Sequence, residues 1–424
     1  MRFVFLIFCL ISFAPITAQK LVRNELISDE RIKSVLLQRQ GWELSYPVIR
    51  LNSDEKLILR FDLIGDDPDS YYYRFVHCDK DWNESGIFVN DYLDGFPENP
   101  VEDYKASFNT TVHYFHYNLL FPNDRVKFNI SGNYIIIIYK PEEPDKTVLT
   151  RRFVIAEDAA SVKVNVHRPQ MTNNSDTHQQ IDFTVNHGRV NITDPYRNVY
   201  AAILQNGVWS TAKTNLKPEF YGNNELKYSS LSESNIFAGG NEFRYFDIKS
   251  IRYNSENVRS IEFIYPYYNV FLYPSDNREF KPYFYRKDLN GKYYVAFQEG
   301  RNADTDADYV YVYFTLPAYQ PAEGGSMYVF GALSDWKTGK GNRMHFNSEK
   351  RQYECSMLLK QGWYDYQYVF VKDGEDTPVT GPFEGNHYET ENDYSILVYY
   401  RNPRERYDRV IGSATANTLN RISD

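Results

Sequence analysis

The sequence contains only three cysteines in 424 residues, and one of them, Cys9, lies close to the N-terminus. A small secreted scaffold held together by disulfides would need many more. Cys78 and Cys355 lie far apart along the chain and are expected to be small apolar residues in sheets of different domains. The sequence therefore predicts a chain that is held together by its packed cores.

The sequence also lacks an excess of basic residues and the short motifs of common enzymes. It has 47 basic and 56 acidic residues, with a net charge of -9, which argues against a dedicated nucleic-acid binder. It contains no Gly-x-Ser-x-Gly, His-Glu-x-x-His or P-loop motif, and its eight histidines do not show the spacing of a zinc site. No catalytic, metal-binding or cofactor-binding residue is therefore predicted.

A single apolar run lies at the N-terminus and no second long run follows it. Met1 and Arg2 precede a predominantly apolar run over residues 3–13, and a small residue, Ala18, comes before Gln19. This pattern predicts a Sec-type signal peptide over residues 1–18. Phe8 before Cys9 argues against a lipoprotein site, which requires a small residue there. No membrane-spanning segment is predicted in the rest of the chain.

Aromatic residues are abundant, with 38 tyrosines, 28 phenylalanines and five tryptophans. Apolar residues alternate with polar ones over several short segments, such as residues 57–63, which is typical of strands with one buried face. Residues 135–138 form a continuous apolar run, as in a strand that is covered on both faces. The best candidates for short helices are residues 29–38 and 103–106. The predicted fold is all-β, with three tandem immunoglobulin-like β-sandwich domains.

Two polar, turn-rich stretches, residues 156–161 and 274–278, divide the strand patterns into pieces of ordinary domain size. The pattern fades after Arg401. The predicted organisation is a signal peptide over residues 1–18, an N-terminal β-sandwich over 19–158, a middle β-sandwich over 159–280, a C-terminal immunoglobulin-like domain over 281–402 and a flexible tail over 403–424.

Two local motifs in the last predicted domain resemble functional sites. In both cases the sequence favours a structural role. The segments 327–336 and 358–368 resemble immunoglobulin-like modules that include starch-binding domains, but a second aromatic platform is missing. Trp336 is therefore expected to be a packing residue. Asp304, Asp306 and Asp308 have the start of a calcium loop without its glycine and final glutamate, which favours a solvated turn before Tyr309.

Several longer strings resemble one known family, the plug proteins of the type IX secretion system, along nearly the whole chain from Glu25 to Arg401. The strings are GWELSYPVIRL (41–51), YYYRFVHCDKDW (71–82), DYLDGF (91–96), FPN (121–123), TRRF (150–153), AAILQNGVW (201–209) and GGNEFRYFDI (239–248).

The resemblance implies a non-enzymatic, cofactor-free periplasmic protein of Bacteroidota-type bacteria. It implies docking on a large outer-membrane translocon β-barrel, at the inner face of the outer membrane, and closure of the idle pore. An exported glycan-binding or adaptor protein is the alternative, and an outer-membrane β-barrel and a hydrolase on a sandwich scaffold are further rivals. The docking face is not predicted. The turn with Tyr92, Leu93 and Phe96 is the one element offered as a probe, although a buried structural turn is favoured there.

Overall fold

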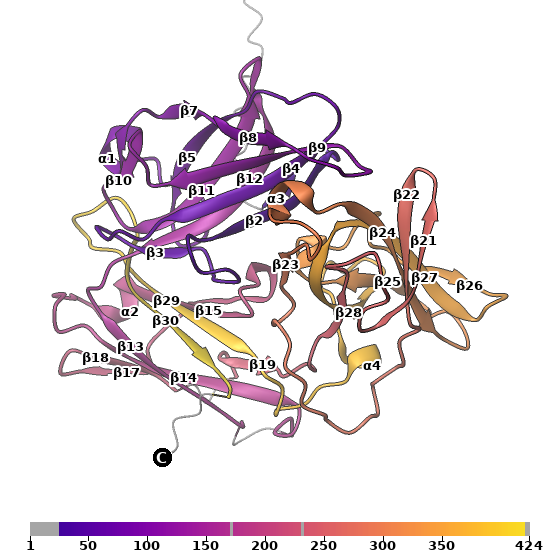
Figure 1. Ribbon diagram of the computed structural model, residues 1–424. Coiled ribbons are helices and arrows are strands. Elements are labelled where there is room, and N and C mark those ends of the chain that lie inside the picture. Colours follow the sequence, from indigo (N-terminus) through magenta and orange to yellow (C-terminus); the bar gives the residue numbers. More distant parts are fainter. Residues whose placement is uncertain (1–24, 170–172, 230–232, 420–424) are drawn as a thin grey trace, which may run out of the picture.

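The computed structural model describes residues 25–169, 173–229 and 233–419, so the predicted signal peptide lies outside the described residues. The described chain is built almost entirely from antiparallel strands, which form three two-sheet units (Figure 1). The predicted all-β fold with three β-sandwich units is confirmed. None of the helices in the described residues has the length and apolar character needed to cross a membrane.

The first unit lies at the top of Figure 1 and consists of two facing sheets and a short strand pair. One sheet has the order β1 (Leu26–Ile27), β12 (Glu143–Ala156), β11 (Gly132–Lys140), β5 (Tyr72–Cys78) and β7 (Glu98–Pro100), with β3 (Val48–Arg50) paired to β12. The facing sheet has the order β2 (Ile32–Arg39), β4 (Leu57–Ile64), β9 (Tyr114–Phe121) and β8 (Asp103–Ala106). The strand pair is β6 (Leu93–Gly95) with β10 (Val126–Phe128).

The second unit combines segments from the middle and the end of the chain. One sheet has the order β13 (Ser161–His167), β14 (His178–Asn186), β18 (Glu225–Tyr228) and β17 (Phe220–Gly222), with β19 (Ile236–Ala238) paired to β14. The other has the order β16 (Lys213–Leu216), β15 (Val199–Gln205), β29 (Asp393–Tyr400) and β30 (Arg409–Asn417).

The third unit lies between these two segments in the sequence. One sheet has the order β20 (Arg244–Asp247), β28 (Gly362–Lys372) and β23 (Tyr293–Val295), with β25 (Gly325–Phe330) paired to β28. The other has the order β21 (Val258–Ile264), β22 (Tyr267–Leu272), β24 (Tyr309–Pro317), β27 (Gln352–Lys360) and β26 (His345–Asn347). The helices are single turns, α1 (Val89–Tyr92), α2 (Pro195–Asn198), α3 (Ala303–Asp306), α4 (Gly381–Glu384), η1 (Trp209–Thr211) and η2 (Ala332–Ser334).

Two predicted domain boundaries differ from the structure. The structure places β20, β21 and β22 in the sheets of the third unit, although they fall within the predicted middle domain 159–280. β29 falls within the predicted domain 281–402, yet it pairs with β15 of the second unit. The third unit is thus inserted into the second. The sheet that each strand joins depends on distant residues, so turn-rich stretches along the sequence do not mark the boundaries of the units.

The predicted flexible tail over residues 403–424 is also wrong for its central part. β30 pairs with β29 along the edge of the second unit, and Val410 and Ile411 in β30 are fully buried. The helices expected at 29–38 and 103–106 are likewise strands, β2 and β8. Both are edge strands, and their extended form comes from pairing with β4 and β9.

The strand patterns that were predicted correctly lie where the sandwich faces are most regular. Leu57, Leu59, Phe61 and Leu63 in β4 are fully buried in the core of the first unit. The apolar run in β11 contributes Ile136 to this core and Ile137 to a second core on the opposite face of the sheet. The second core also contains residues of the second unit, so the run is apolar because another unit covers its outer face.

Candidate docking body and the junctions between its units

The junction between the first and third units contains a buried ion pair. Lys360 Nζ lies 2.7 Å from Asp62 Oδ2, and both side chains are at most 1% exposed. Tyr309 donates its hydroxyl to the same oxygen at 2.6 Å, and His116 Nδ1 lies 2.6 Å from Asp62 Oδ1. Burial alone would raise the pKa of Asp62, but Lys360 and His116 outweigh that effect and hold its pKa below the ordinary value.

Asp308 forms a second connection across the same junction. Its carboxylate accepts hydrogen bonds from the Thr111 backbone N–H at 2.7 Å, the Thr111 hydroxyl at 2.6 Å and the Val112 N–H at 3.1 Å. The residue is 5% exposed, so the prediction of a solvated turn is wrong at this position. Asp308 instead satisfies backbone donors of the first unit. The described residues contain no group of His, Cys, Asp and Glu side chains that could hold a metal ion.

The first and second units share an apolar core. Ile135 and Ile137 of β11 belong to the same buried cluster as Leu397 of β29. Trp82 and Trp209 meet edge to face in this cluster, with ring centroids 4.9 Å apart. A continuous apolar junction of this kind resists separation because pulling the units apart would expose its buried surface to water.

Lys292 of the third unit contacts both of the other units. Its ammonium donates to the carbonyl oxygen of Leu44 at 2.8 Å and lies 3.9 Å above the ring of Tyr46, both in the first unit. It also lies 3.7 Å from the carboxylate of Asp393 in the second unit. The Tyr46 hydroxyl donates to that carboxylate at 3.1 Å. Burial lowers the pKa of Lys292, and the negative charge of Asp393 opposes this shift.

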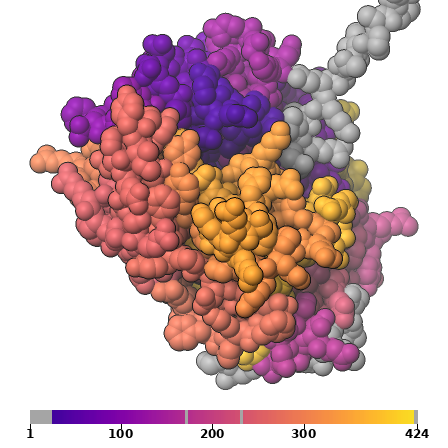
Figure 2. Space-filling model, turned by 90° about the vertical axis from the view of Figure 1, so that its right-hand side faces the viewer, coloured from indigo at the N-terminus to yellow at the C-terminus, as the bar shows by residue number. Residues whose placement is uncertain are grey.

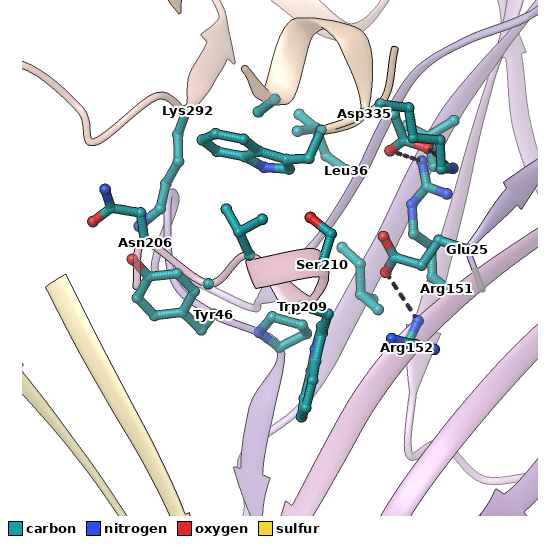
Figure 3. A pocket seen from close by; sticks show the side chains of 18 of the residues that line it. Glu25, Leu36, Tyr46, Arg151, Arg152, Asn206, Trp209, Ser210, Lys292 and Asp335 are labelled. Atoms are coloured by element: carbon teal, nitrogen blue, oxygen red, sulfur yellow. Dashed lines mark hydrogen bonds and ion pairs between the residues drawn. The ribbon is translucent and has the colours of Figure 1, made fainter. Parts of the chain in front are cut away.

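A cleft of about 570 Å³ opens where the three units meet (Figure 3). Lys292 and Tyr46 lie on one side, and Arg151, Asp335 and Glu25 lie on the other. Arg151 and Asp335 form an ion pair across the first and third units at 2.8 Å. Lys292 and the Arg151–Asp335 pair therefore hold the units together.

Trp336 lines this cleft and has the packing role expected from the sequence. Its ring meets Phe330 edge to face with centroids 5.6 Å apart, and it meets Phe243 in the same way at 6.1 Å. Gly291 allows the close approach of the indole, since a Cβ at Gly291 would lie 2.3 Å from Trp336 Cη2. Cys78 and Cys355 are both free thiols buried in sheets, also as expected.

The three residues offered as an interface probe do not form one surface. Tyr92 and Leu93 are 5% and 3% exposed and belong to the core of the first unit. Tyr92 donates its hydroxyl to the Phe75 carbonyl at 3.1 Å. Phe96 is 69% exposed. The favoured interpretation of a buried structural turn therefore holds for Tyr92 and Leu93. Phe96 is the one member of the three that a partner can reach.

A larger group of exposed apolar side chains was missed in the sequence. It lies at the tip of the β21–β22 hairpin, where Phe263, Ile264 and Tyr265 are 54%, 56% and 87% exposed. The hairpin rises away from the body of the third unit (Figure 1). The signal in the sequence was the uncharged run FIYPYY over residues 263–268, which is difficult to distinguish from a core strand by composition alone.

A family model described as the first domain of the type 9 secretion system plug protein matches residues 32–157. These bounds agree with the first unit from β2 to the end of β12. A search of curated proteins found no match.

Solved structures were also compared with the chain. It is similar to a hypothetical protein from Parabacteroides merdae, with 36% identity, a TM-score of 0.89, and coverage of 93% of this chain and 99% of that chain. An adhesion glycoprotein from Streptococcus agalactiae aligns over 92% of this chain and 97% of that chain, with 7% identity and a TM-score of 0.13, which is too low to indicate a shared fold.

The fold and the family match together define a class of protein. The chain is a β-sandwich protein of several units that is connected with the type IX secretion system, and the plug family is a non-catalytic, extracytoplasmic component of that system. The chain belongs to the type 9 secretion system plug protein family.

Proposed function

We propose that this protein docks on the periplasmic mouth of the outer-membrane translocon barrel of the type IX secretion system and blocks its pore when no substrate passes. In this proposal the protein closes the pore by its size and catalyses no reaction. In this proposal the chain is exported by its signal peptide and works in the periplasm, at the inner face of the outer membrane.

The proposal rests on the observation that the three β-sandwich units pack into one body. Figure 2 shows the third unit, in salmon to orange, lying directly against the first unit, in indigo to purple. The junctions contain a shared apolar core, the Asp62–Lys360 ion pair and the contacts of Lys292. Domains joined by small polar interfaces move relative to one another, whereas apolar and ionic junctions of this kind resist that motion. A seal over a wide aqueous pore needs that stiffness.

The experiment is a pull-down from solubilised cell envelopes with the tagged mature chain, followed by mass spectrometry of the bound proteins. We expect recovery of a very large outer-membrane barrel. The matched control is the same bait after thermal unfolding, which should recover none. Recovery of no barrel by the folded bait would contradict the proposal. Binding to a glycan array in that case would favour the alternative of an exported glycan-binding or adaptor protein.

A further inference from the structure

Strand β21 is an unusually open edge of the third unit. It is seven residues long, lies at the end of its sheet and pairs with β22 alone. In an antiparallel ladder every second residue directs its N–H and C=O groups away from the paired strand. Within the described residues, no other segment forms hydrogen bonds with the backbone of residues 260–264. The outer side of β21 can therefore accept a further strand.

The other sheet edges in the described part of the chain are short or covered. β2 lies against the third unit, where Ser34 and Tyr309 share a hydrogen bond of 2.7 Å. β13 and β30 lie against each other, and β25 is covered by residues 342–344 through two backbone hydrogen bonds. The remaining edge strands have four residues or fewer. Proteins normally protect long edges in these ways because open edges pair with other chains.

The side chains at the tip of this hairpin are apolar and uncharged, whereas the rest of β21 carries Arg259 and Glu262. Phe263, Ile264 and Tyr265 are exposed, and Phe263 packs on Tyr268 with ring centroids 4.9 Å apart. Glu262 is the charged residue nearest the tip, and residues 263–268 contain none. Anionic lipid headgroups attract clusters of lysine and arginine, which this tip lacks. An open strand edge with exposed apolar side chains instead fits an extended apolar polypeptide.

We infer that the open edge of β21, with Phe263, Ile264 and Tyr265, binds an extended apolar segment of the translocon by adding it to this sheet as a further strand. The inference rests on the proposed function and names the element that makes the contact. Main-chain hydrogen bonds supply the attachment, and the three side chains select apolar residues in the added segment. The edge lies on a rigid body, so a contact at this hairpin holds the whole plug in place.

The first test places a lysine on the edge. Phe263→Lys and Ile264→Lys introduce a charge at exposed positions, so the fold should persist, with a melting temperature equal to that of the wild type. The tagged variants are used as bait in solubilised envelopes, and we expect the recovered barrel to fall by about tenfold or more. The matched control is Tyr319→Lys, because Tyr319 is a 90% exposed aromatic residue in the loop after β24. This control should recover the barrel as the wild type does.

The second test replaces Tyr265 with a photo-crosslinking amino acid in the full chain, with the same replacement at Tyr319 as control. A crosslink from position 265 to the barrel, and none from 319, supports the inference. A crosslink from position 265 to a second copy of this chain, to a secreted substrate or to lipid overturns it. Full barrel recovery by both lysine variants also overturns it and leaves the proposed function standing. Failure of the wild-type bait to recover any barrel rejects the proposed function and this inference with it.

Discussion

Replacing Lys360 with methionine tests how much the buried ion pair stabilises the junction between the first and third units. The change keeps the length and apolar volume of the side chain but removes its charge. Asp62 would then be buried without its lysine partner, although Tyr309 and His116 still contact its two oxygens. Removing one partner of a buried pair costs about 3–5 kcal/mol because the remaining charge is not compensated. We expect a loss near the lower limit of this range, since two hydrogen bonds remain.

The matched control is Lys350→Met. Lys350 pairs with Glu354 at 3.0 Å but is 63% exposed, and exposed pairs contribute about 0–1 kcal/mol. Urea unfolding, followed by circular dichroism, gives the free energy from the midpoint and slope of the transition. The double variant Asp62→Asn/Lys360→Met should recover much of the loss, because no charge is left alone in the junction. Equal stabilities of Lys360→Met and Lys350→Met would refute the reasoning.

Three further predictions concern pH, the end of the chain and the cleft. Burial lowers the pKa of His77 to about 4, whereas the unfolded chain binds this proton near 6.5. Stability should therefore fall by about 3 kcal/mol as the pH drops through this window, and the unfolding free energy of His77→Gln should depend less steeply on pH than that of the wild type. Truncation after residue 408 removes β30, which contains the buried Val410, so the second unit should lose its cooperative thermal transition, whereas truncation after residue 419 should preserve it. Trp336→Ala removes packing against Phe330 and should cost about 3 kcal/mol in urea unfolding, while unchanged stability would contradict its structural role.

Local patterns in the sequence were sufficient for the strands of the cores. The alternation in β4 identified its buried face, and the run in β11 indicated cover on both sides. The continuous strings identified the family, because such strings depend on residue identity rather than on folding. These features are encoded within a few neighbouring residues, so they need no knowledge of the tertiary structure.

The junctions depend on residues that are distant in the sequence and could not be predicted in this way. Asp62 occupies a polar position of the β4 alternation, which normally faces water, and its partner Lys360 is 298 residues away. β29 pairs with β15, but nothing in the local sequence of β29 indicates this partner. Tyr92 and Phe96 are close neighbours with similar rings, and the fold buries one and exposes the other. The docking candidate was missed for the same reason, because exposure is a property of the assembled sheet.

The most direct test of the pore-blocking proposal is the conductance of the purified translocon barrel in a planar lipid bilayer, before and after addition of the folded chain to its periplasmic side. The account predicts a large open conductance that falls nearly to zero on addition and returns when the chain is washed away. The Tyr319→Lys variant should block as the wild type does. Binding of the chain to the barrel with an unchanged conductance would contradict the central claim that this body closes the pore.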